Sequence, residues 1–111
     1  MKIIIIPKLK EYRILAITIF PFIFVRDKSV LEKPVNLNHE MIHSVQQKEM
    51  WLIFFYLFYY IEYLVRGFKN RGDWSKAYYQ ISFEREAYEN EKDLEYLKKR
   101  NSFSWVDYLK N

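Results

Sequence analysis

The chain has 111 residues, of which 50% are hydrophobic and 20% aromatic, with only two glycines and three prolines. This length and composition fit one folded domain and exclude collagen-like, linker-like and disordered proteins. The sequence contains no cysteine, which excludes disulfide scaffolds, cysteine-ligated metal sites and thiol nucleophiles. Its net charge of +4 comes from scattered basic residues rather than a dense basic run, so we expect no nucleic-acid partner.

The first quarter of the chain predicts β-structure. Segments rich in β-branched residues indicate strands at Lys2–Ile6 and Leu15–Ile19, and the pattern continues after Pro21 over Phe22–Val25. Residues 26–37 are polar and turn-forming, which indicates a loop. We therefore expect a short N-terminal β-sheet or hairpin.

The rest of the chain predicts three helices. Asn38 is a favourable N-cap for the first helix, and a second helix follows it to about Arg66. Both glycines lie within residues 67–73, which indicates a break in the helical pattern. Ser75 is placed to cap a third, long helix that reaches roughly Arg100.

These elements together predict an α+β fold in a single domain over residues 1–111. Residues 1–37 form its β-rich part and residues 38–111 its helical part. The tail at residues 101–111 is apolar enough to dock on the domain.

One apolar segment needs comparison with a membrane span. Met50–Val65 is 16 residues long, which is short of the ~20 that a helix needs to cross the hydrocarbon core, and it carries Glu62. We interpret it as a buried core helix rather than a membrane-embedded one. The N-terminus does not have the pattern of a signal peptide, so we expect a cytoplasmic protein, with peripheral membrane contact left open.

The two histidines of the chain stand four residues apart, in the order His39-Glu40-Met41-Ile42-His43, which is the HExxH pattern. On a helix, residues at this spacing lie ~40° apart around the axis and ~6 Å apart along it, so both imidazoles can bind one metal ion. Glu40 projects beside them, where it can hold a metal-activated water. The alternative is a pair of exposed histidines with a glutamate in the first helical turn.

A catalytic zinc site needs a third protein ligand, and a carboxylate is what the sequence offers, since there is no third histidine. Glu84 and Glu86 are the two candidates on the third predicted helix. Ala77, Ile81, Glu84 and Ala87 repeat at helical spacing, which places Glu84 on the apolar stripe and Glu86 on the polar side. A carboxylate on a core-facing stripe is costly unless it is paired or metal-bound, so Glu84 is the predicted ligand.

His39-Glu40-Met41-Ile42-His43 followed by Glu84-Arg85-Glu86-Ala87 resembles the gluzincin clan of zinc metallopeptidases, and at this length the mini-gluzincin type. The resemblance implies a minimal zincin-like domain in which a sheet precedes an active-site helix, an aromatic core helix and a glutamate helix. It also implies a Zn²⁺ ion on His39, His43 and Glu84, with Glu40 as the catalytic base that acts on a peptide or protein substrate.

The sequence departs from the clan at one supporting position. Tyr88 stands where the clan commonly has an aspartate that orients a zinc histidine. That role either is lost or passes to another residue, for which Glu91 is a candidate. No tyrosine or histidine can be assigned by spacing as the residue that stabilises the oxyanion.

Three functional hypotheses follow, and the first is a zinc-dependent peptidase that is active or latent. Its substrate would pair with the strand at residues 22–26, and the aromatic tail would either cover the cleft or, as we favour, simply pack on the domain. The second is a non-catalytic helical interaction protein with a structural or vestigial zinc site, and the third is a membrane-surface protein.

Of the remaining polar residues, Glu62 is expected to pair with Arg66 and Gln46 to lie on the helix surface.

Overall fold

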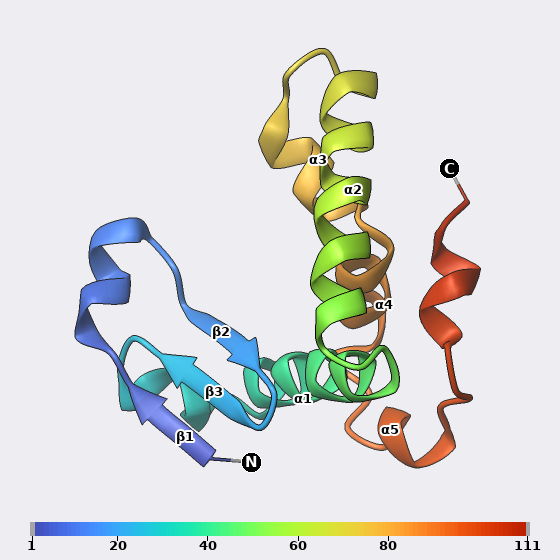
Figure 1. Ribbon diagram of the computed structural model, residues 1–111. Helices are drawn as coiled ribbons and strands as arrows, with labels where there is room; N and C mark the ends of the chain where they lie inside the picture. The colour runs from blue at the N-terminus through green and yellow to red at the C-terminus, as the bar shows by residue number, and fades with distance from the viewer. Residues whose placement is uncertain (1, 111) are drawn as a thin grey trace.

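The computed structural model describes residues 2–110, and it confirms the α+β class (Figure 1). Met1 and Asn111, the ends of the predicted domain, lie outside the described residues. Three strands come first and five α-helices follow, with short 3₁₀ helices between them: β1 (Lys2–Ile5), η1 (Pro7–Tyr12), β2 (Ala16–Ile19), β3 (Phe22–Val25), η2 (Lys28–Glu32), α1 (Pro34–Glu49), α2 (Ile53–Lys69), α3 (Trp74–Gln80), α4 (Ser82–Asn90), α5 (Tyr96–Lys99) and η3 (Ser104–Tyr108).

The strands form one sheet in the order β1-β3-β2. β3 is central: it pairs in parallel with β1, with Ile23 opposite Ile3, and antiparallel with β2, with Phe24 opposite Ile17. Ile23 and Val25 on β3 are fully buried and pack with residues of η2 and α1. The sheet therefore lies against one side of α1, while the other helices extend from its far end (Figure 1).

Helix α1 begins at Pro34, five residues before the predicted first residue, His39. Pro34 stands at its N-terminal turn, where the fixed φ of proline suits a helix and its missing N–H costs nothing. The predicted N-cap, Asn38, lies inside the helix instead. Its side chain donates to the backbone oxygens of Glu91 at 2.8 Å and Asp93 at 3.0 Å, so it caps the C-terminal end of α4.

The prediction that the second helix is a buried core helix is wrong. Only Phe55, Arg66 and Gly67 of α2 are buried, and most of its aliphatic and phenyl side chains are exposed. The helix leaves α1 through Trp51 and Leu52, both at positive φ, and rises crosswise from it (Figure 1). Among the described residues, no helix is both long and apolar enough to cross a membrane.

The third predicted helix is divided in three. Asp73 rather than Ser75 caps α3, by accepting a hydrogen bond from the backbone of Lys76. The helical run breaks at Ile81, which is extended and fully buried in the core. Glu62 caps the N-terminus of α4: its carboxylate accepts hydrogen bonds from the backbone N–H and the hydroxyl of Ser82.

The tail after α5 returns to α4, as expected. Trp105 is buried against Phe83 with ring centroids 4.6 Å apart. Arg100 anchors the start of this segment: its guanidinium contacts Glu86 on α4 and Glu49 on α1 (Nη2–Oε1 2.7 Å). Glu86, predicted on the polar side of the helix, is therefore fully buried, because Arg100 neutralises it there.

Replacing Arg100 tests this buried ion pair. Arg100→Met would leave the Glu86 carboxylate buried without a counter-charge, and we expect the free energy of unfolding to fall by about 3–5 kcal/mol. Urea denaturation followed by circular dichroism measures the change. Lys98→Met, which removes an exposed pair with Glu95, is the matched control and should change stability by less than about 1 kcal/mol. Equal effects of the two substitutions would contradict the role of Arg100.

Candidate metal centre

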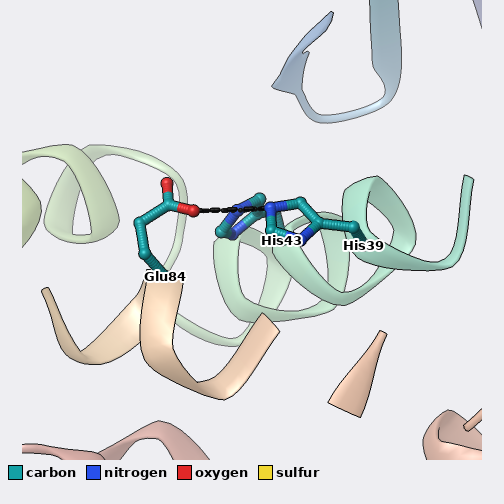
Figure 2. A group of neighbouring side chains, drawn as sticks. All are labelled: His39, His43 and Glu84. Carbon is teal, nitrogen blue, oxygen red and sulfur yellow. Dashed lines mark hydrogen bonds and ion pairs between the residues drawn. The ribbon is translucent and has the colours of Figure 1, made fainter. Parts of the chain in front are cut away.

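Three buried side chains predicted as metal ligands lie together between α1 and α4. His39 and His43 come from successive turns of α1, and Glu84 reaches toward them from α4 (Figure 2). The two Nε2 atoms are 3.1 Å apart, and Glu84 Oε1 lies 3.0 Å from His43 Nε2 and 3.4 Å from His39 Nε2. The three side chains could hold one metal ion, since each offers a ligand atom within 4.8 Å of the others.

The hydrogen bonds of His43 fix which of its ring nitrogens faces this cluster. Gln46 Nε2 donates to the backbone oxygen of Phe83 at 3.0 Å and to Glu86 Oε1 at 2.9 Å, so the Gln46 oxygen must point the other way. That oxygen lies 2.8 Å from His43 Nδ1 and accepts its proton. Nε2 of His43 is therefore the nitrogen that is directed to the metal position.

His39 is oriented in the same manner by a carboxylate. Its Nδ1 donates to Glu91 Oε2 at 2.9 Å, which leaves Nε2 to face the cluster. Because Tyr88 stands where an aspartate was expected, Glu91 was the candidate to contact His39, and that hydrogen bond is present. Tyr88 packs its ring against the His39 imidazole instead, with centroids 4.4 Å apart.

Glu84 is held through its second oxygen. The Tyr59 hydroxyl on α2 donates to Glu84 Oε2 at 2.6 Å, while Oε1 faces the histidines. Glu86, the other candidate ligand, lies outside the cluster, because its carboxylate is bound to Arg100, Gln46 and Tyr96. The carboxylate side of the candidate centre is therefore supplied by Glu84.

The Glu84 carboxylate and the His43 imidazole strongly affect each other's ionisation. Burial disfavours the protonated imidazole of His43, but the Glu84 carboxylate outweighs burial and raises the pKa of His43 to about 9. Burial by itself would raise the pKa of Glu84, yet the charge of His43 and the hydrogen bonds to the carboxylate hold that pKa well below its usual range. A cation, whether a proton or a metal ion, is therefore favoured between these groups.

A pocket of about 620 Å³ opens beside the cluster. Glu40, the predicted catalytic base, lines it together with all three candidate ligands. Glu40 Oε1 accepts a hydrogen bond of 2.7 Å from the Thr18 hydroxyl on β2, which fixes the carboxylate at the wall of the pocket. The other walls are the segment at residues 13–18 and aromatic side chains of α2, α3 and α4: Phe55, Tyr56, Tyr59, Tyr78, Tyr79 and Tyr88.

The sequence missed the residues that support the ligands. Gln46 was expected on the helix surface but is fully buried, because it links His43 to Glu86. Its position three residues after His43 was a signal, since that spacing shares a helix face. Tyr59 and Thr18 gave no such signal, because their contacts join segments 25 and 22 residues apart. The expected pair of Glu62 with Arg66 is present at 3.8 Å.

The aromatic tail was predicted to pack on the domain rather than cover the cleft. No described residue after Arg100 lines the pocket. The segment packs along α4 instead, through Trp105 and through hydrogen bonds that Arg85 donates to the backbone oxygens of Tyr108 and Lys110. These contacts support the preferred interpretation, in which the tail packs on the domain.

The raised pKa of His43 predicts how the metal-free protein responds to pH. A group whose pKa is higher in the folded state than its ordinary value of 6.5 stabilises the fold below pH 6.5 and loses that contribution as pH rises through about 9. We expect the urea midpoint of the metal-free chain to fall across this window. Glu84→Gln, which removes the charge that raises the pKa, should flatten the curve, and a wild-type midpoint that does not fall would contradict the geometry.

The hydrogen bond from His39 to Glu91 predicts a loss of metal affinity when it is removed. Glu91→Ala deletes the acceptor that orients His39, and we expect affinity for a divalent metal to drop about 10- to 100-fold. Competition with a chromogenic chelator measures this. Glu89→Ala, at an exposed position two residues earlier, is the matched control and should leave the affinity unchanged.

Comparison with known proteins does not assign the chain to a family. No family model matches it, and no curated protein or solved structure matches it significantly. The candidate metal centre therefore rests on the side-chain geometry: two imidazoles and one carboxylate, each oriented by a partner of its own.

Proposed function

We propose that the chain is a zinc-dependent peptidase of the mini-gluzincin type. One observation carries the proposal: His39 Nε2, His43 Nε2 and Glu84 Oε1 are separated by 3.0–3.4 Å. Ligands bound to tetrahedral zinc at about 2.0–2.1 Å lie about 3.3 Å from one another. The histidine and carboxylate set matches the donors that catalytic zinc sites use, and the adjoining pocket leaves room for a substrate.

The residues around the zinc position divide the chemistry between them. A bound zinc ion supplies Lewis-acid activation of a water molecule and of the scissile carbonyl. Glu40, at the pocket wall, accepts the proton of the attacking water and delivers it to the amine that leaves. Thr18 donates to one oxygen of Glu40, so the other oxygen is the one available to the water.

The substrate would lie along β2. The predicted site on residues 22–26 is excluded, because β3 has partners on both edges. β2 pairs with β3 alone among the described strands, and the segment at residues 13–18, which leads into β2, lines the pocket. An extended peptide can add to such an edge through backbone hydrogen bonds. Gln47 and Tyr56 both donate to the backbone oxygen of Thr18 and so occupy that acceptor, which leaves the part of the edge before Thr18 for a peptide.

The hydroxyls of Tyr78 and Tyr88 are the candidate donors for the oxyanion that forms on the substrate. Burial and the nearby Glu84 raise the pKa of Tyr78 far above its usual range, and burial raises the pKa of Tyr88 to about 12. Both groups therefore stay protonated at neutral pH and can donate to the oxyanion of a peptide under attack. Their hydroxyl oxygens are 3.5 Å apart at the pocket.

A change at Glu40 separates a peptidase from a zinc protein without activity. Glu40→Gln removes the proton acceptor while leaving His39, His43 and Glu84 intact, so we expect turnover to fall by about 10²- to 10⁴-fold with zinc content unchanged. Cleavage of a peptide library, read by mass spectrometry, measures turnover, and plasma mass spectrometry measures zinc. Glu84→Gln is the control that should lose zinc and turnover together.

Two outcomes would contradict the proposal. Zinc-loaded wild-type protein that cleaves no peptide in the library would favour the non-catalytic alternative, an interaction protein with a structural zinc site. A wild-type protein that binds no zinc when zinc is offered would remove the metal centre itself. Glu32→Gln, at an exposed position outside the pocket, guards against a general effect of removing an acidic residue.

A further inference from the structure

The outward face of α2 is a continuous apolar strip. We call this face the aliphatic strip and define it by seven residues: Ile53, Phe54, Leu57, Phe58, Ile61, Val65 and Phe68. Each of these side chains is between 46% and 77% exposed. Their spacing places them on one side of the helix, over about 22 Å of its length. The structure describes every residue of α2, and Lys69 is the one exposed charged side chain of this helix.

The inward face of the same helix places Phe55 in the core and carries polar side chains beside it. Glu62 accepts two hydrogen bonds from Ser82, and the Tyr59 hydroxyl donates to Glu84. Arg66 donates to the backbone oxygen of Leu109 at 2.8 Å. These buried polar contacts fix the rotation of α2, because turning the strip inward would leave them unsatisfied. The exposure of the strip is therefore built into the fold.

The ends of the aliphatic strip carry the residues that suit a lipid interface. Trp51, 81% exposed, precedes it and Trp74, 38% exposed, follows it. Tryptophan favours the boundary between headgroups and acyl chains. The exposed basic residues are Lys48 at one end and Lys69 and Arg71 at the other.

The acidic residues near both ends have other partners. Glu49 is bound to Arg100, and Asp73 caps α3. The charge presented beside the strip is therefore mainly positive, which complements an anionic surface. Apart from the hydroxyl of the exposed Tyr60 at its edge, the strip offers no side-chain donor or acceptor, whereas a typical protein interface includes about ten hydrogen bonds.

We propose that the aliphatic strip docks α2 on the surface of a membrane that contains anionic lipids. The helix lies in the plane of the interface, with its phenyl and aliphatic side chains among the acyl chains and its basic ends at the headgroups. The pocket lies on the opposite side of α2, through Phe55, Tyr56 and Tyr59, and stays open to water. This inference does not depend on the metal or on peptidase activity.

Sedimentation of the full chain with lipid vesicles tests the proposal. We expect binding to vesicles of phosphatidylcholine with about one-third phosphatidylglycerol, and weaker binding to phosphatidylcholine alone or in high salt. Leu57→Gln with Ile61→Gln removes the centre of the strip and should weaken binding about tenfold or more. Leu94→Gln with Val106→Gln, equally exposed but outside the strip, should bind as wild type does.

A second variant keeps the test independent of any folding defect. Lys69→Glu with Arg71→Glu changes exposed side chains, so the fold is preserved, and it should abolish the preference for anionic vesicles. Wild-type protein that binds neither vesicle would overturn the proposal. So would a dimer in lipid-free solution that Leu57→Gln with Ile61→Gln converts to a monomer, because a second copy would then cover the strip. Equal binding by the strip variant and its control would overturn it as well.

Discussion

The buried amide of Gln46 is the constraint on which both the candidate metal centre and the C-terminal packing depend. Its nitrogen donates to the Phe83 backbone oxygen and to the Glu86 carboxylate, and its oxygen accepts from His43. One side chain therefore sets the tautomer of a candidate ligand, His43, and hydrogen-bonds a buried carboxylate, Glu86. Arg100 completes the series by neutralising Glu86. The imidazole of His43 is thus connected through hydrogen bonds to a residue 57 positions away in the sequence, so the candidate metal centre and the stability of the fold depend on the same side chains.

The parts that could be predicted from sequence are those with a local pattern. The four-residue spacing of His39 and His43 on one helix, and the apolar neighbours of Glu84, were sufficient to name the three side chains that lie together. β-branched segments separated by polar turns were sufficient for the α+β class. The contact of Glu91 with His39 could also be predicted, because Glu91 lies seven residues after Glu84 on the same predicted stripe.

The parts that could not be predicted depend on contacts between distant segments. The polarity of Glu86 indicated an exposed position, but an arginine 14 residues later made burial favourable. An apolar segment such as α2 indicated a core helix, yet hydrogen bonds from Ser82 to Glu62 turned its polar side inward. Asn38 had the chemistry of a cap, but α1 begins at Pro34, and Asn38 instead caps the end of α4 by donating to Glu91, 53 residues away in the sequence.

The link from Gln46 to Glu86 also limits how this sequence can change over evolution. An apolar residue in place of Glu86 would suit a buried position, but it would take from Arg100 one of its two carboxylate partners, leaving Glu49, and would remove one of the two acceptors that hold the Gln46 amide. The first substitution at any of these three positions therefore carries a cost that only a second substitution can relieve. Positions 46, 86 and 100 are expected to vary together among descendants of this chain, even though none of the three side chains is a candidate metal ligand.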